Sequence, residues 1–119
     1  MALYRRKTEV ATRPLVPPIS PMPRPSKLSD VEIQRALGGL SGWSRRGDTL
    51  TKTFAFARFS DGIAFVNAIA TAADRMDHHP DIDIRYTKVT IALSTHSAGG
   101  ITQLDLTLAE QIEQIAGST

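Results

Sequence analysis

Three segments of the chain carry apolar residues at the three- and four-residue spacing of a helix that buries one face. The first begins at Ser29-Asp30-Val31-Glu32, a capping box whose hydroxyl and carboxylate bind free amide groups at a helix start, and it ends at Gly38-Gly39. The second should begin after Ser60 as N-cap and end before His78-His79-Pro80, because the residue before proline is pushed out of helical geometry. The third is capped by Thr102. The expected inner faces consist of Val31, Ile33, Leu37 and Leu40; of Ile63, Val66, Ile69, Ala70 and Ala73; and of Leu104, Leu108, Ile112 and Ile115.

Four shorter segments are typical of strands, namely residues 43–45, 49–56, 83–87 and 88–95. The first two flank a turn at Gly47-Asp48, and the last two flank a turn near Tyr86-Thr87-Lys88. The order of elements is therefore α-β-β-α-β-β-α. Strands in adjacent pairs, with helices between the pairs, predict an α+β fold in which a four-stranded antiparallel sheet carries three helices on one face.

The first 26 residues differ from the rest in composition. They hold six of the seven prolines, and proline lacks an amide donor and fixes its own φ, so we expect neither a helix nor a central strand there. Residues 1–26 are interpreted as a disordered, basic, proline-rich leader, and residues 27–119 as one folded domain. Two other interpretations stay open: an organelle-targeting peptide, for which serine and threonine are few, and an arm that docks on a partner.

The net charge of +2 is unevenly distributed along the chain. The leader carries five basic residues and one acidic residue, whereas residues 27–119 carry nine basic and eleven acidic residues. A mildly acidic domain argues against direct binding of nucleic acid, which needs a basic patch on the fold itself. No apolar run approaches the ~20 residues of a membrane span, and the absence of cysteine removes disulfides and thiolate chemistry. We expect a soluble, cytoplasmic protein without a membrane partner.

All three histidines of the chain lie between two acidic residues, in the pattern Asp74-x3-His78-His79-Pro80-x5-Tyr86-x9-His96-x8-Asp105. Histidine is the side chain whose ordinary pKa, about 6.5, allows proton transfer near neutral pH. Imidazoles gathered between carboxylates therefore indicate general acid–base chemistry. If strands 83–87 and 88–95 pair as a hairpin, Pro80 and His96 are about equally far from its turn. All three imidazoles then meet at one edge of the sheet.

Three structural interpretations compete with this hypothesis. Histidines at a helix end can act as a C-terminal cap, because a cation there complements the helix dipole. The three histidines could instead bind zinc, but adjacent residues rarely converge on one tetrahedral ion and the i, i+4 spacing of helical ligands is missing, so we predict no metal site. His96 alone is compatible with an ordinary polar residue at a strand end.

The run from His78 to Tyr86, the strand end Ser94-Thr95-His96, the turn Ala98-Gly99-Gly100-Ile101-Thr102 and Asp105 resemble the pterin-4a-carbinolamine dehydratase family. The likeness extends from about Leu28 to Ala116, includes Trp43 and Phe65-Val66-Asn67, and leaves out the leader. The resemblance implies a lyase that converts 4a-hydroxytetrahydropterin to quinonoid dihydropterin and water during tetrahydrobiopterin recycling. It also implies that no metal or organic cofactor is needed.

The resemblance assigns roles to individual residues. His78, His79 and His96 are the implied catalytic histidines that contact the pterin, with His79 the first candidate for the general acid, and Asp105 orients one imidazole. Three further positions are expected near the substrate: Asp74, which either supports His78 or is a solvated helix residue; Trp43, which either stacks on the pterin or lies in the core; and Thr95. Tyr86 is expected to pack rather than to take part in chemistry.

A second class of function stays open. Members of the family are also known as non-catalytic dimerisation cofactors or assembly factors with the same fold, and a basic proline-rich leader would suit such a role. The three histidines and two acids favour the enzyme, since a binding module has no physical need of them. A sheet with one uncovered face and free edge strands also predicts self-association, as a homodimer or a homotetramer.

Overall fold

The computed structural model describes residues 25–118, which form three α-helices, four strands and one short 3₁₀ helix. In chain order the elements are α1 (Asp30–Leu37), β1 (Ser44–Arg46), β2 (Thr49–Ala55), α2 (Phe59–Met76), β3 (Asp81–Arg85), β4 (Lys88–Leu93), the 3₁₀ helix η3 (His96–Ala98) and α3 (Gln103–Gly117). This is the predicted order, and the α+β class is confirmed. None of the helices within residues 25–118 combines the length and the apolar character needed to cross a bilayer.

The four strands form one antiparallel sheet in the order β1-β2-β4-β3. Both predicted hairpins are present: β1 and β2 turn at Gly47-Asp48, and β3 and β4 turn at Tyr86-Thr87. The second and fourth strands then pair in the middle of the sheet. In the β3–β4 register Asp81 lies opposite Ala92, so the start of β3 is beside the end of β4.

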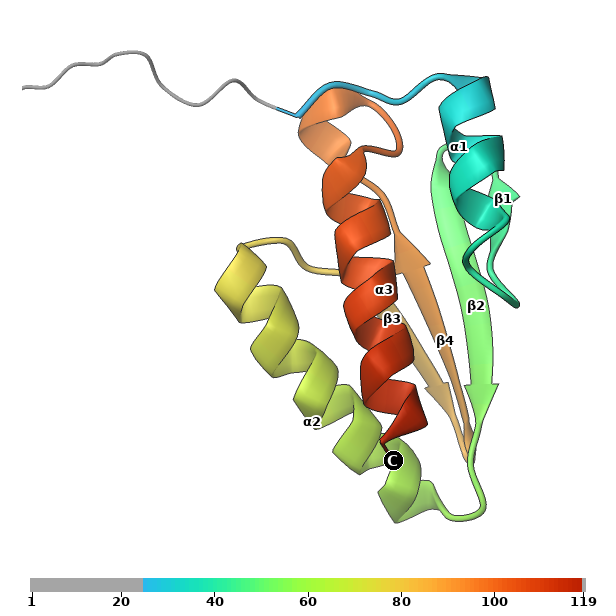
Figure 1. The fold of residues 1–119 in the computed structure, drawn as a ribbon. Helices are drawn as coiled ribbons and strands as arrows, with labels where there is room; N and C mark the ends of the chain where they lie inside the picture. The colour runs from blue at the N-terminus through green and yellow to red at the C-terminus, as the bar shows by residue number, and fades with distance from the viewer. Residues whose placement is uncertain (1–24, 119) are drawn as a thin grey trace, which may run out of the picture.

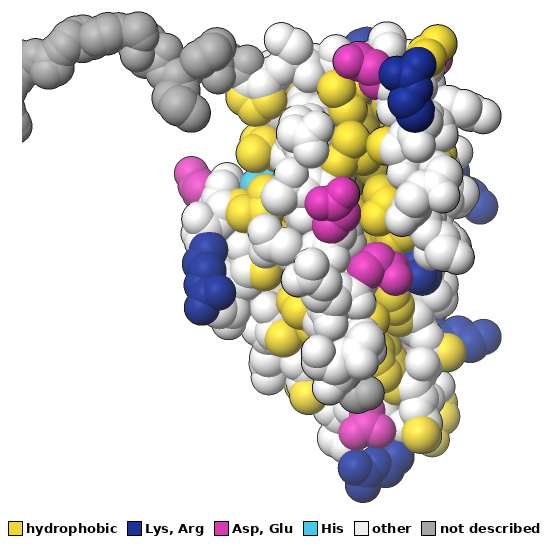
Figure 2. Space-filling model, viewed as in Figure 1, with side chains coloured by type: hydrophobic (Ala, Val, Ile, Leu, Met, Phe, Trp, Pro, Cys, Tyr) yellow, Lys and Arg dark blue, Asp and Glu magenta, His cyan; other side chains and the backbone are white. Residues whose placement is uncertain are grey.

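The helices lie on one side of this sheet (Figure 1). Alternation along the strands turns Leu50 and Phe54 of β2 and Val89 and Ile91 of β4 into the core, where they are buried. Phe65 of α2 and Ile112 of α3 are buried against them. Seen from the helix side, some apolar surface stays visible between the helices (Figure 2). The outer face of the sheet carries mostly polar and charged side chains instead, including Thr53 and Thr90, whose hydroxyls are 2.8 Å apart.

The elements differ from expectation in several details, among them the strand bounds, which shift by one or two residues. The second helix begins at Phe59, because Arg58 rather than Ser60 occupies the N-cap and its carbonyl accepts the amides of Asp61 and Gly62. Val31 is 61% exposed and lies off the buried stripe, because a residue two positions before Ile33 faces nearly the opposite side of a helix. β3 starts and ends two residues before the predicted 83–87.

The predicted leader lies outside the described residues except for Pro25 and Ser26. The residues that follow it are bound directly to the folded domain, since the Leu28 amide donates to the Ile101 carbonyl at 2.8 Å. The side chain of Lys27 covers Gly100, where an added Cβ would come within 2.9 Å of Lys27 Cδ. The domain therefore begins beside the loop that follows β4.

Candidate active site

The three histidines lie on two connections at the same end of the sheet. His78 and His79 stand between the end of α2 and the start of β3, and His96 opens η3 just after β4. Because β3 and β4 are antiparallel neighbours with Asp81 opposite Ala92, these two connections are adjacent. The two connections that carry the histidines therefore meet at this end of the sheet, as the hairpin spacing predicts.

His78 is a buried residue that faces α3. The helix before it ends at Met76, and the C-cap residue Asp77 has a left-handed backbone (φ 51°, ψ 43°), so that the His78 amide bonds back to the Ala73 carbonyl at 3.1 Å. This reversal brings His78 Nε2 to 2.6 Å from Asp105 Oδ1. The Asp105 side chain is fully buried, and only about a tenth of the His78 side chain is exposed.

Asp105 is hydrogen-bonded to three other buried residues, and together they form the Asp105 network, which consists of His78, Thr95, Thr102 and Asp105. Its second oxygen, Oδ2, accepts the Thr95 hydroxyl and the Thr102 amide, both at 2.9 Å. The Thr102 amide bond is half of the capping box that starts α3. A carboxylate with all of these donors is held in a single orientation, so the start of α3 also fixes His78.

His79 is exposed and pairs with a different carboxylate. Its Nε2 is 2.9 Å from Asp74 Oδ1 on the last turn of α2. The expectation that Asp74 supports His78 is wrong in this structure. The physical reason is that His79 precedes Pro80 and is biased to extended backbone, so the two successive histidines face opposite ways, one inward to α3 and one outward over α2.

His96 is also exposed, and its position is set by the residue before it. Thr95 and Gly100 exchange backbone hydrogen bonds, of 2.8 Å from the Thr95 amide and 3.3 Å from the Gly100 amide. These two bonds close a loop of residues 96–99, in which Gly99 has a φ of 76° that favours glycine. His96 is thus the first residue of a tightly closed loop, with Thr95 in the Asp105 network behind it.

The structure does not leave every predicted site residue exposed beside the histidines. Trp43 is a core residue: its ring packs edge-on against Phe54, and its Nε1 donates to Glu113 at 2.8 Å, far along α3 from Asp105. Thr95 is buried in the Asp105 network and not exposed toward a ligand. Tyr86 is 78% exposed at the opposite end of the sheet, so the expectation that it packs is wrong within this chain.

Chemically, the site offers two exposed imidazoles and a third, buried one whose orientation Asp105 fixes. The exposed pair can exchange protons with a bound molecule, and the buried one is positioned by a carboxylate, as in other acid–base sites. Within residues 25–118 no three histidine, aspartate or glutamate side chains are arranged to hold a metal ion.

A family model described as pterin 4 alpha carbinolamine dehydratase matches residues 26–115, which include the whole of this site. The chain belongs to the pterin 4 alpha carbinolamine dehydratase family.

Relatives of known sequence and structure agree with this membership. A protein of Roseiflexus sp. (strain RS-1), named "Putative pterin-4-alpha-carbinolamine dehydratase", is 52% identical over 90 residues, covering 76% of this chain and 97% of the relative. A protein of the same name from Mycobacteroides abscessus is 54% identical over 76% of this chain and 96% of its own length.

Two solved structures are similar in fold. A transcriptional coactivator/pterin dehydratase from Brucella melitensis matches with a TM-score of 0.76 and 35% identity, over 77% of this chain and all of its own. A pterin dehydratase-like protein identified as a RuBisCO assembly factor in the alpha-carboxysome matches with a TM-score of 0.53 and 27% identity. That second match covers 65% of this chain and 89% of the other.

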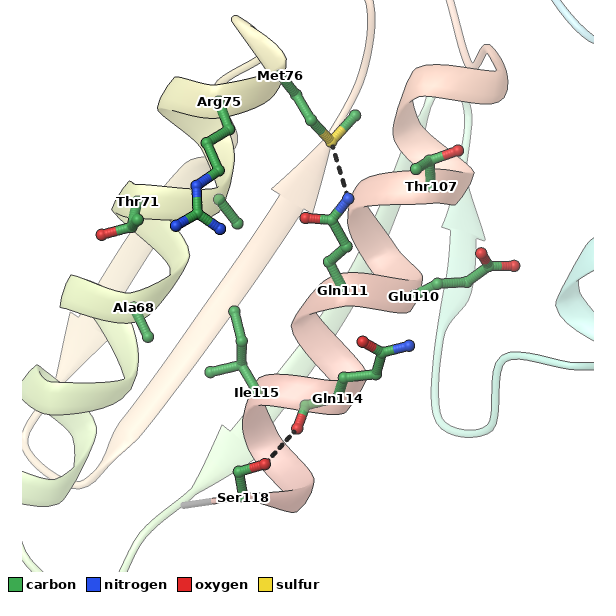
Figure 3. Close-up of a pocket in the computed structure, with 11 residues that line it drawn as sticks. Ala68, Thr71, Arg75, Met76, Thr107, Glu110, Gln111, Gln114, Ile115 and Ser118 are labelled. Carbon is green, nitrogen blue, oxygen red and sulfur yellow. Dashed lines mark hydrogen bonds between the residues drawn. The ribbon is translucent and has the colours of Figure 1, made fainter.

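One groove of this dehydratase-family domain lies apart from the histidines. It lies between α2 and α3, with a volume of about 1040 Å³, and none of the predicted site residues lines it. Figure 3 shows Thr71 and Arg75 on α2 and Gln111 and Gln114 on α3 among the lining residues, and Gln111 Nε2 is 3.6 Å from Met76 Sδ. We base the site on the histidines and their carboxylates, because the groove has no comparable arrangement of acid and base.

One member of the site was missed by sequence reasoning. Thr102 is predicted as the cap of the last helix, but its contact with Thr95, 2.8 Å between hydroxyls, makes it part of the Asp105 network as well. The available signal was the spacing Thr102-x-x-Asp105, in which a capping box shares its acidic residue with the histidine pattern.

Proposed function

We propose that this protein is a hydro-lyase that removes water from 4a-hydroxytetrahydropterin to give quinonoid dihydropterin. The observation that carries the proposal is the presence, on two adjacent connections, of two exposed imidazoles, His79 and His96, and of a third that Asp105 holds in the interior. Membership of the dehydratase family supplies the substrate class. Both together support acid–base catalysis rather than binding alone.

In the proposed reaction the bond between C4a and its hydroxyl breaks while a C=N bond forms to the adjacent ring nitrogen. The lone pair of that nitrogen expels the hydroxyl, which leaves as water after it receives a proton, and the nitrogen gives up its own proton. Imidazoles suit both transfers at neutral pH. We assign the general acid to His79, which is exposed and has Asp74 to stabilise its imidazolium, and the base to His96.

The direct test is a stopped-flow assay of quinonoid dihydropterin formation from freshly generated carbinolamine. The reaction also proceeds spontaneously, so the informative quantity is the increase in rate with enzyme concentration at pH 7. A rate proportional to enzyme concentration is expected. A rate equal to the spontaneous one, with folded protein, would rule the proposal out.

A second candidate is a non-catalytic role as an assembly factor or dimerisation cofactor. It is favoured by the similarity to the pterin dehydratase-like protein identified as a RuBisCO assembly factor. One double variant, His79→Ala with His96→Ala, distinguishes the two candidate functions when it is compared with the wild type. Loss of dehydration with retained partner binding would show two separate roles, whereas an inactive wild-type protein that still binds a partner would favour assembly alone.

We further propose that the protein acts in the cytoplasm as a homodimer or homotetramer in tetrahydropterin recycling. Within residues 25–118 one face of the sheet carries no helix and β1 and β3 are its edge strands, which supports association, because exposed strand edges favour pairing with another chain. Light scattering at micromolar concentration tests this point. A monomeric mass at 100 μM, about a hundred times a ~1 μM dissociation constant, would contradict it.

A further inference from the structure

We propose that Thr95 and Thr102 are positioning residues that select the tautomer of His78, through a chain of hydrogen bonds that can run in only one direction. The chain joins Leu104, Thr102, Thr95 and Asp105, and it ends at the histidine. This inference deepens the proposed function, on which its catalytic consequence rests, but the tautomer itself can be measured without substrate.

The direction follows from counting protons. A threonine hydroxyl has one proton to donate. Thr95 donates its proton to Asp105 Oδ2 at 2.9 Å, so the 2.8 Å contact between the two threonine hydroxyls must use the proton of Thr102. Thr102 Oγ1 in turn accepts the Leu104 amide at 3.2 Å. Each member therefore donates toward Asp105.

The hydrogen bonds at the last member of this series determine which Asp105 oxygens act as acceptors. Oδ2 already accepts the Thr95 hydroxyl and the Thr102 amide, so it has no room for a proton of its own. Hydrogen bonds donated to a carboxylate favour its charged form. Oδ1 is then an acceptor too, and its partner 2.6 Å away, His78 Nε2, must be the donor. In the neutral imidazole this leaves Nδ1 as the nitrogen that can accept a proton.

Thr95 also connects two histidines. Its hydroxyl acts on His78 through Asp105, and its backbone, paired with Gly100, holds the start of the loop that opens with His96. A single buried residue, Thr95, thus selects the tautomer of His78 through its hydroxyl and directly precedes His96 in the chain. The burial of both Thr95 and Thr102 excludes water, which would otherwise offer alternative donors and allow the chain to reverse.

A purely structural role makes a different prediction. If the two threonines only cap α3 and close the loop, their removal lowers stability and leaves the imidazole tautomer unchanged. Thr95→Val removes the hydroxyl and keeps the shape, and Thr95→Ser keeps the hydroxyl. Thr90→Val is the matched control, since Thr90 has an equal 2.8 Å hydroxyl contact with Thr53 on the outer face of the sheet.

The experiment is long-range ¹H–¹⁵N correlation NMR of the histidine rings in the full-length protein at pH 8.5, with His78 assigned from its missing signals in His78→Ala. We expect the Nε2–H tautomer for His78 in the wild type, Thr95→Ser and Thr90→Val. Thr95→Val should shift the tautomer ratio about tenfold toward Nδ1–H, the scale of losing one hydrogen bond to a charged group. Asp105→Asn, whose amide can donate to Nε2, should give mainly Nδ1–H.

An Nδ1–H tautomer in the wild type overturns the proposal, whatever the variants do, and so does an unchanged ratio in folded Thr95→Val. Failure of the dehydratase proposal is recognised separately, because it leaves these spectra unchanged. If the chain is a dehydratase, Thr95→Val should lower kcat about tenfold with little change in KM, and Thr95→Ser should restore it.

Discussion

Asp74 Oδ1 lies 2.9 Å from His79 Nε2 in a pair that is open to solvent, with 77% of the aspartate side chain and 57% of the histidine side chain exposed. The neighbouring histidine makes the opposite kind of pair, buried against Asp105. An exposed ion pair contributes at most about 1 kcal/mol to stability. The two pairs therefore predict different consequences of mutation, the first for turnover and the second for folding as well.

Replacing His79 should affect catalysis far more than folding. His79→Ala is expected to lower the dehydration rate about 10²-fold, the usual scale for losing a general acid, because no other described imidazole pairs with an exposed carboxylate. The melting temperature should stay within about 2 °C of wild type. Stopped-flow kinetics and thermal unfolding measure the two quantities, and a near-normal rate would leave His79 as a simple helix-end residue.

Replacing Asp105 should destabilise the fold. Asp105→Ala leaves His78, the Thr95 hydroxyl and the Thr102 amide without their shared acceptor in the interior, so the free energy of unfolding should fall by about 3 kcal/mol. Urea denaturation measures this change. Asp83→Ala is the control, since its ion pair with Arg85 is exposed and the substitution should change stability by less than about 0.5 kcal/mol. Equal effects of the two substitutions would contradict the assigned role of the network.

The sequence predicts that the two connections carrying the histidines lie side by side, but it does not predict which carboxylate each histidine contacts. Residue counts from the Tyr86-Thr87 turn determine which parts of β3 and β4 lie side by side, so the approach of His79 to the His96 loop follows from spacing alone. Which histidine meets which carboxylate depends on the left-handed backbone of Asp77 and on the packing of α3 against α2. Neither leaves a periodic signal in the sequence. Trp43 was ambiguous for a similar reason, because its partner Glu113 is 70 residues away.

Glu113 should stabilise the domain through two donors on the helix-covered face of the sheet. Its Oε2 accepts Trp43 Nε1 at 2.8 Å and Lys52 Nζ at 2.7 Å. Glu113→Ala leaves a part-buried ammonium and an indole N–H without this acceptor, so we expect a loss of about 2 kcal/mol in the free energy of unfolding. Glu110→Ala, exposed on the same helix, should cost less than about 0.5 kcal/mol. If both variants unfold at the same urea concentration, the prediction is wrong, and water serves as well as the Glu113 carboxylate as the acceptor for these two donors.

Acid should weaken the first helix through Glu32. The backbone amide of Ser29, followed by its hydroxyl, holds the pKa of Glu32 below its usual value of 4.5. A lowered folded-state pKa means that the stabilising contribution is complete above the unfolded-state pKa and is lost as the pH falls through the folded-state value. Stability measured from pH 6 to pH 3 should therefore fall more in the wild type than in Glu32→Gln. Parallel curves for the two proteins would show that the charge has no effect.

Deleting residues 1–24 should leave both the dehydration rate and the melting temperature nearly unchanged. The proline spacing predicts no packed element there, and the described contacts of Lys27 with Gly100 and of the Leu28 amide with the Ile101 carbonyl come after the cut. The matched comparison is deletion of residues 1–28, which also removes the part-buried Leu28 side chain and this bond. That longer deletion should lower the melting temperature by several degrees, since it exposes apolar surface next to Ile101.

Because Lys27 covers Gly100 beside the His96 loop, a segment attached here is close enough to act on the site. A large loss of activity in the shorter deletion, with an unchanged melting temperature, would therefore mean that the leader contributes to substrate binding.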